Sequence, residues 1–182
     1  MMDQNLVRFS KFLSLVLRHN PGRFGITLDA SGWADIEAVI AGANRAGIPL
    51  TRPLLECVVA ENDKQRFAFN ADGTAIRARQ GHSIPVDLQL VPVQPPTQLY
   101  HGTAERFLPA IREQGLIRRS RQYVHLSPDE VTALKVGQRH GPPVVLRVES
   151  GAMAHDGHVF YCSENGIWLV DAVPAQYIIF PE

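Results

Sequence analysis

The stretch RFAFNADGTAIRAR, residues 66–79, decides how the first half of the chain folds. Asp72-Gly73 is a strong hairpin turn signal, and it lies between two strand-like runs, residues 66–70 and residues 74–79. The sequence therefore predicts two antiparallel strands that are joined by a tight turn.

Upstream of this hairpin, three segments have the apolar spacing of amphipathic helices. These segments are residues 6–19, 35–46 and 53–62. The first ends at Asn20-Pro21, because the residue before a proline is disfavoured in the α region. Three helices followed by a hairpin predict a winged-helix lobe, which we place at residues 1–84.

Downstream of the hairpin, residues 85–97 contain four prolines and few charges, which is typical of an extended connector. The rest of the chain, residues 98–182, has mostly short strand-like runs and two helical segments. The runs are residues 98–101, 144–148, 158–161, 167–170 and 177–180, and the helical segments are residues 104–114 and 128–137. We therefore expect a β-rich second lobe and, for the whole chain, an α+β protein with two lobes.

Two local features of this second lobe also have a structural interpretation. Ser127 precedes Pro128, an arrangement typical of an N-cap residue followed by the first residue of a helix. Residues 163–166, Ser-Glu-Asn-Gly, are predicted to form a hairpin turn.

The composition excludes several classes of protein. The 182 residues include 18 basic and 18 acidic side chains, so the chain does not coat nucleic acid by bulk electrostatics. No apolar run approaches the roughly 18 residues of a membrane helix, and the charged start is unlike a signal peptide, so we expect a cytoplasmic protein. The two cysteines form no disulfide framework and the seven histidines are scattered, so no metal site is expected.

The basic residues are unevenly placed along this neutral chain. They gather in three short groups, Arg18-His19 with Arg23, Arg77 with Arg79, and Arg118-Arg119 with Arg121. Arginine is much commoner than lysine here, and its planar guanidinium suits bidentate recognition of phosphate. A single exposed arginine is usually only a solvated charge, but three groups indicate local anion sites.

Four short strings interrupt the apolar patterns with polar or basic residues. They are LRHNP (17–21), DKQRF (63–67), YHGT (100–103) and SRQYVHLS (120–127). His-Gly-Thr at the end of a strand would place a side chain and two backbone amides where glycine allows a ligand to come close. Each string taken alone is weak evidence.

Taken together and in this order, the strings resemble the RNA 2′-phosphotransferase family, the enzymes that finish tRNA splicing in eukaryotes and also occur in bacteria and archaea. The resemblance covers nearly the whole chain. It extends to SKFLSLVLRHNP (10–21), IRARQGHSIPVDL (76–88) and FYCSENGIWLVDAVPAQYI (160–178). It implies a winged-helix RNA-binding lobe at residues 1–84 and an NAD-binding lobe like that of ADP-ribosyltransferases at residues 98–182.

The resemblance also implies a reaction in two steps. An internal RNA 2′-phosphate attacks the nicotinamide ribose of NAD and expels nicotinamide, and a neighbouring ribose hydroxyl then attacks phosphorus. The products are RNA with a free 2′-hydroxyl and ADP-ribose cyclic phosphate. The expected partners are tRNA-like 2′-phosphorylated RNA and NAD as a consumed co-substrate, without a metal, a membrane or an obligate protein partner.

Motif matching then assigns residues. The implied catalytic group is Arg18, His19, Arg66 and Arg121, with Arg119 as the alternative in the last position. The implied NAD contacts are His101, Gly102, Thr103, His125 and Ser127. The implied RNA phosphate contacts are Arg77, Arg79, Gln80, His82 and Arg119. The chain departs from the family pattern at Tyr123, where many members carry histidine, and at Arg79, where asparagine is common.

Two other functions stay open at this point. One is a winged-helix module that binds nucleic acid without catalysis, and it would not bind NAD. The other is an ADP-ribosyltransferase that stops after the first step and caps nucleic-acid phosphates, and it would leave ADP-ribose on its product.

Overall fold

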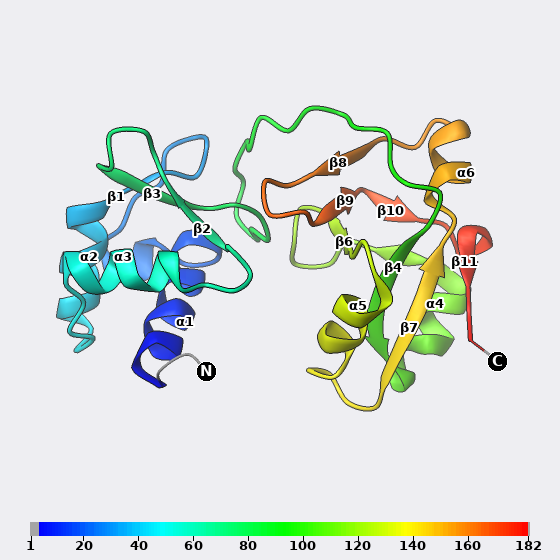
Figure 1. The fold of residues 1–182 in the computed structure, drawn as a ribbon, viewed down its shortest axis with the longest axis horizontal. Helices are drawn as coiled ribbons and strands as arrows, with labels where there is room; N and C mark the ends of the chain where they lie inside the picture. Colours follow the sequence, from blue (N-terminus) through cyan, green and yellow to red (C-terminus); the bar gives the residue numbers. More distant parts are fainter. Residues whose placement is uncertain (1–3, 182) are drawn as a thin grey trace. The chain divides into compact units, whose positions relative to one another are not determined.

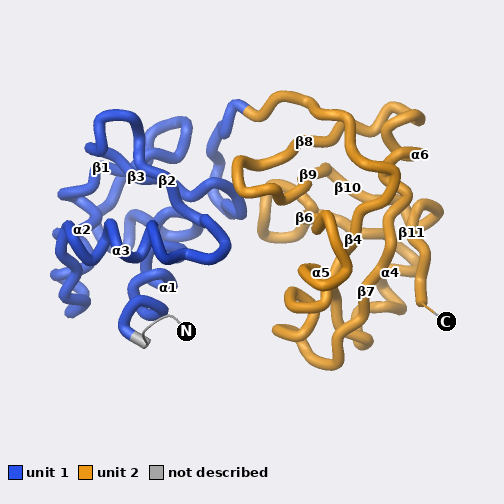
Figure 2. The backbone as a smooth tube through the Cα atoms, in the orientation of Figure 1, with its two compact units in different colours: residues 1–89 blue, residues 90–182 orange. Residues whose placement is uncertain are grey.

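The computed structural model describes residues 4–181, in which helices and strands are mixed, and this confirms the predicted α+β class. The chain divides into two compact units, residues 1–89 and residues 90–182 (Figure 2). Among the described residues, no helix has both the length and the apolar character needed to cross a membrane.

Unit 1 contains three helices (Figure 1). Their apolar faces share one core. The helices are α1 (Gln4–Arg18), α2 (Ile36–Arg45) and α3 (Arg52–Ala60), and a short 3-10 helix, η1 (Gly22–Phe24), follows α1. Fully buried members of the core recur at helical spacing: Leu13, Val16, Leu17, Val39, Leu55 and Val58. The three predicted helices are therefore confirmed.

Short polar side chains set where α2 and α3 begin. Asp35 Oδ1 accepts a hydrogen bond from the Ala38 N–H at 2.8 Å, at the start of α2. Thr51 precedes α3, and Pro53 lies in the first turn, where a helix does not need its missing N–H.

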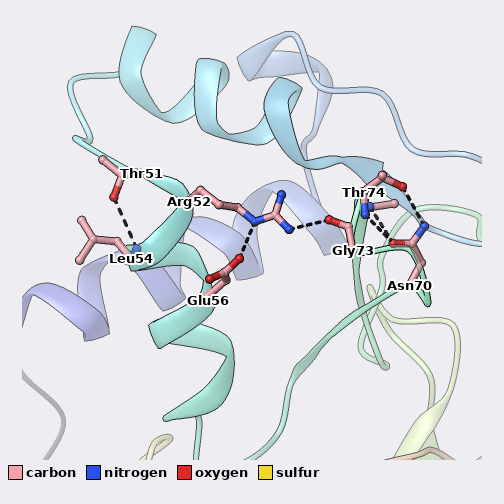
Figure 3. A network of polar contacts seen from close by, with 8 residues as sticks. Thr51, Arg52, Leu54, Glu56, Asn70, Gly73 and Thr74 are labelled. Atoms are coloured by element: carbon pink, nitrogen blue, oxygen red, sulfur yellow. Dashed lines mark hydrogen bonds and ion pairs between the residues drawn. The ribbon is translucent and has the colours of Figure 1, made fainter.

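The predicted hairpin is confirmed, and a third strand joins it. The antiparallel sheet has the order β1 (Ala34–Asp35), β3 (Ala75–Ala78), β2 (Phe67–Phe69). Asn70 Oδ1 accepts hydrogen bonds from the N–H groups of Thr74 and Ala75, each at 2.9 Å, and Gly73 in the turn has φ +65°. Arg52 of α3 donates to the Gly73 carbonyl oxygen at 2.6 Å, which ties the helix to the turn (Figure 3).

The proline-rich segment after this sheet contains neither a helix nor a named strand. The Asp87 N–H donates to the Ala30 carbonyl oxygen at 2.8 Å within unit 1. Further along, the Val93 N–H donates to the Phe160 carbonyl oxygen at 2.9 Å within unit 2. The backbone of the segment is therefore hydrogen-bonded in each unit.

Unit 2 contains three small antiparallel sheets. One has the order β11 (Ile178–Ile179), β7 (Pro143–Val148), β4 (Leu99–Ala104), and another has the order β6 (Val124–Leu126), β9 (Trp168–Val170), β8 (Phe160–Cys162). The third pairs β10 (Ala172–Val173) with β5 (Leu116–Ile117). Tyr100 and Ser127 exchange two backbone hydrogen bonds, at 2.9 and 2.7 Å, and so join β4 to the end of β6.

The core of this unit includes Leu99, Leu126, Leu146, Met153 and Phe160, and helices pack around its sheets. The helices are η2 (Glu105–Phe107), α4 (Leu108–Gln114), α5 (Glu130–Gly137), α6 (Ser150–His155) and η3 (Ala175–Tyr177). The predicted turn at residues 163–166 is confirmed, because the Ser163 N–H donates to the Ile167 carbonyl oxygen at 2.9 Å and Gly166 has φ +75°.

The predicted start of the helix after β6 is wrong by two residues. Asp129 caps α5, because its Oδ1 accepts a hydrogen bond from the Thr132 N–H at 2.7 Å, and the helix begins at Glu130. Ser127 is instead held by backbone pairing with Tyr100, so its side chain has no capping role.

Candidate functional site

In unit 1, Arg18 and His19 lie where α1 ends. Arg18 is the last residue of the helix and only 7% of it is exposed, whereas His19 is exposed. A buried guanidinium is rare, because the loss of hydration must be offset by specific surroundings. Arg18 is therefore more than a charge that complements the helix dipole.

The segment Gly81–Ser83 packs directly on these two residues. The Ser83 N–H donates to the Arg18 carbonyl oxygen at 2.9 Å, and Ser83 Oγ lies 2.8 Å from His19 Nδ1. Gly81 has φ +91°, and a Cβ atom there would lie 3.5 Å from Arg18 Cζ. A chain segment more than 60 residues away in the sequence thus holds the end of α1.

His82, at the centre of that segment, is inside the protein and only 1% exposed. Among the residues that the structure describes, neither of its ring nitrogens has a hydrogen-bond partner. Burial, together with the nearby positive charges of Arg18, His19 and Arg77, lowers the pKa of His82 to about 4. The ring is therefore neutral near pH 7.

Arg66, just before β2, is fixed to α1 through other side chains. Its Nη1 and its backbone N–H both donate to Asn62 Oδ1 at 3.3 Å. Asn62 is 2% exposed, and its Nδ2 donates to Ser10 Oγ of α1 at 3.2 Å. Arg66 itself is half-buried.

Two further arginines lie on and just after β3. Arg77 Cζ is 4.5 Å from the centroid of the Trp33 ring, and Arg79 Nε donates to the Phe67 carbonyl oxygen at 3.3 Å. Both are half-buried, and the buried Ala78 between them faces the core. Gln80, the next residue, is also half-buried.

In unit 2, two histidines form a chain of contacts on β4 and β6. His101 Nδ1 lies 3.1 Å from the His125 carbonyl oxygen, and His125 Nδ1 lies 3.0 Å from the Tyr123 carbonyl oxygen. Because a carbonyl oxygen only accepts, each Nδ1 carries a proton and donates it. In the neutral rings, each Nε2 therefore carries the lone pair.

The surroundings favour the uncharged form of His101. Burial lowers the pKa of His101, the hydrogen bond to the His125 carbonyl opposes this shift, and the charge of His140 adds to the lowering. Thr103 and Ser127 beside this pair are 5% and 6% exposed. The two histidines are half-buried, and the group is rich in hydrogen-bonding atoms.

Gly102 has a structural reason to be glycine. A Cβ atom on it would lie 1.7 Å from the Ala133 carbonyl oxygen, so the backbone of α5 is in contact with β4 at this point. Because Gly102 has no side chain, the backbone of α5 can lie directly against the strand at this position.

The loop between β5 and β6 holds the arginines of the third group. Arg118 Nη1 forms an ion pair with Asp171 Oδ1 at 2.9 Å, with both side chains largely exposed. Loss of hydration lowers the pKa of Arg121, and the positive charge of Arg139 also lowers it. Arg119 is exposed. The ion pair distinguishes Arg118 from Arg119 and Arg121, the two candidates for the last position of the catalytic group.

Within residues 4–181, no three His, Cys, Asp or Glu side chains are grouped so as to hold a metal ion. The candidate side chains are instead mainly those of arginine, histidine, serine and threonine.

Comparison with known proteins identifies the family. Residues 4–172 match the model of the RNA 2′-phosphotransferase, Tpt1 / KptA family. The chain belongs to the RNA 2′-phosphotransferase family. A protein of Rhodopirellula baltica named "Probable RNA 2′-phosphotransferase" is 57% identical over 98% of both chains. Proteins with the same name from Hahella chejuensis and Streptomyces coelicolor are 55% and 53% identical over at least 95% of each chain.

In this RNA 2′-phosphotransferase chain, the structure brings some of the assigned residues together. Arg18, His19, Arg77 and His82 are neighbours in unit 1, and His101, His125 and Ser127 are neighbours in unit 2. Sequence reasoning missed Asn62, Ser10 and Trp33, because no local pattern shows that they contact an assigned arginine. Ser83 was inside a family string, but only its contact with His19 shows why it matters.

Proposed function

We propose that this chain removes an internal 2′-phosphate from RNA by transferring it to NAD. The observation that carries the proposal is the family match over residues 4–172, together with relatives that are named for this activity. The buried Arg18 beside His19 supports it, because both belong to the group of residues that the family resemblance assigns to catalysis.

Each unit has a proposed role. Three helices followed by an antiparallel hairpin support a winged-helix RNA-binding lobe in unit 1. The small antiparallel sheets of unit 2, with a histidine on β4, support an NAD-binding lobe like that of ADP-ribosyltransferases.

The proposed phosphate ligands are Arg18, Arg66 and Arg121, with Arg119 as the alternative to the last. A 2′-phosphate beside the RNA backbone carries a high negative charge, and guanidinium groups bind such oxygens through two parallel hydrogen bonds. The same groups stabilise charge on the phosphoryl oxygens during transfer. Arg77, Arg79 and Gln80 are proposed to contact neighbouring RNA phosphates.

The first chemical step forms a bond between a phosphate oxygen and the anomeric carbon of the nicotinamide ribose. The bond from that carbon to nicotinamide breaks, and nicotinamide leaves with the electron pair. In the second step the neighbouring ribose hydroxyl attacks phosphorus, and the bond from phosphorus to the RNA 2′-oxygen breaks. The hydroxyl proton ends on the RNA 2′-oxygen, and His19 is proposed to relay it.

The residues of unit 2 suit NAD chemically. His101 and His125 offer fixed ring nitrogens, and Thr103 and Ser127 offer hydroxyl groups, without an acidic side chain in the set. Such groups can bind the nicotinamide amide and the ribose hydroxyls of NAD. Gly102 is proposed to keep the strand close to both α5 and the dinucleotide.

The proposal is tested with two matched RNAs, one that carries a single internal 2′-phosphate and one that carries a 2′-hydroxyl. Each is incubated with the protein and EDTA, with or without NAD. We expect loss of the phosphate only with NAD, and NAD consumption only with the phosphorylated RNA. Accumulation of ADP-ribosylated RNA would instead indicate a capping transferase, and absence of NAD binding would indicate a nucleic-acid-binding module.

A further inference from the structure

Ser83 contacts both residues at the end of α1. Its Oγ lies 2.8 Å from His19 Nδ1 and 3.4 Å from the Arg18 carbonyl oxygen. Its backbone N–H donates to the same carbonyl oxygen at 2.9 Å, which fixes the hydroxyl beside the His19 ring. The proposed function gives Ser83 no role.

The Ser83 hydroxyl can meet the His19 ring as donor or as acceptor, and its second contact favours the acceptor role. A serine hydroxyl has one proton to donate and two lone pairs that accept. The Arg18 carbonyl oxygen only accepts and lies 3.4 Å from Oγ, so a hydroxyl proton that points there leaves the hydroxyl oxygen to accept. The hydroxyl oxygen then accepts from Nδ1–H of His19, and the lone pair of the neutral ring lies on Nε2.

We propose that Ser83 is a positioning residue, which holds His19 in the tautomer that has a protonated Nδ1 and an unprotonated Nε2. Nε2 is then the ring atom that takes a proton from a ribose hydroxyl. This proposal rests on the proposed function, because it needs a proton-transfer role for His19.

The neighbours of Ser83 hold the segment in the geometry that this contact requires. Gly81 has φ +91°, a backbone conformation that favours glycine, and it lies against the Arg18 guanidinium. His82 is 1% exposed and anchors the segment inside unit 1. Ser83 itself is exposed, so replacing its hydroxyl leaves no cavity in the core.

The test compares Ser83→Ala, which removes the hydroxyl, with Ser83→Thr, which keeps it. Ser31→Ala is the matched control, because Ser31 is a serine of unit 1 whose recorded hydrogen bond uses only its backbone N–H. The steady-state kcat and the KM for RNA are measured for all three variants and for the wild type. We expect kcat to fall roughly two- to tenfold in Ser83→Ala, the range that one hydrogen bond accounts for, with KM unchanged. Ser83→Thr and Ser31→Ala are expected to match the wild type.

A spectroscopic readout separates positioning from a merely structural role. Long-range proton–nitrogen NMR of the imidazoles, with His19→Asn to assign the signal, reports which nitrogen is protonated. We expect Nδ1 to be protonated in the wild type and in Ser83→Thr, and a mixture of tautomers in Ser83→Ala. A His19 ring protonated at Nε2 in the wild type, or an unchanged kcat in Ser83→Ala, would overturn the proposal.

These outcomes are distinct from failure of the proposed function. If the wild type does not remove the 2′-phosphate, the function itself is wrong. If the wild type removes it and Ser83→Ala does so equally fast, only the role of Ser83 is wrong.

Discussion

His82 is a neutral imidazole in a cationic part of unit 1, and this makes it a pH-dependent element of stability. Its pKa is lowered to about 4 by burial and by Arg18, His19 and Arg77, from the ordinary value of 6.5. Between these two values the unfolded chain binds a proton that the folded chain does not bind. The stability that the neutral ring contributes is therefore complete above about pH 6.5 and is lost as the pH falls toward about 4.

Replacing His82 with leucine removes this titration. Between pH 7 and pH 5, we expect the free energy of unfolding of the wild type to fall by about 2 kcal/mol more than that of His82→Leu. Urea unfolding at the two pH values measures both. An equal pH dependence in the two proteins would show that His82 does not titrate on unfolding.

Arg66 offers a test of catalysis at a residue that is only half-buried. Arg66→Ala removes a proposed phosphate ligand but keeps Asn62 and Ser10, which join this part of the chain to α1. We expect the rate of phosphate transfer to fall about 100-fold or more, because a charged group aimed at the reacting phosphate is lost. Arg8→Ala, at an exposed position of α1, is the control that keeps wild-type activity. Equal activity in the two variants would remove Arg66 from the catalytic group.

At the scale of elements, the contact between α5 and β4 depends on Gly102. A methyl group at Gly102 would meet the Ala133 carbonyl oxygen at 1.7 Å, so the helix must move. We expect Gly102→Ala to lower the free energy of unfolding by about 3 kcal/mol. Gly22→Ala is the control, because no atom lies within 4 Å of its added Cβ, and its stability should stay within about 0.5 kcal/mol of the wild type. Equal stability of the two variants would contradict the close packing of α5 on β4.

The elements that could be predicted are those with a strong local pattern. Regular apolar spacing defined α1, α2 and α3, and Asp72-Gly73 defined the hairpin. The two-residue strands β1, β5 and β10 are too short to show an alternation, and their pairing depends on distant partners. The start of α5 was misplaced because Ser127 and Asp129 both suit an N-cap, and only the pairing of Ser127 with Tyr100 decides between them.

For the candidate site, the sequence predicted which residues belong to it but not how they contact one another. The family strings named Arg18, His19 and His101, but the burial of Arg18 and the two histidine contacts with backbone carbonyl groups come from tertiary packing. The contact of Ser83 with His19 joins residues 64 positions apart, which no local pattern reveals.

At the scale of the whole molecule, the chain has no net charge. We therefore expect RNA binding to depend on a few arginine side chains at specific positions. If about four guanidinium groups contact RNA phosphates, the logarithm of the binding constant should fall with the logarithm of the salt concentration with a slope of about −3. Fluorescence titration of the 2′-phosphorylated RNA at several salt concentrations gives this slope. A slope of about −7 or steeper would indicate a broad electrostatic surface instead.

The measurement that tests the central claim most directly follows the phosphorus atom itself. An RNA whose only labelled atom is the phosphorus of an internal 2′-phosphate is incubated with the protein, NAD and EDTA, and the small products are separated. We expect the label in ADP-ribose cyclic phosphate, with one nicotinamide released for each phosphate removed. Label released as inorganic phosphate, or removal of the phosphate without NAD, would contradict the account.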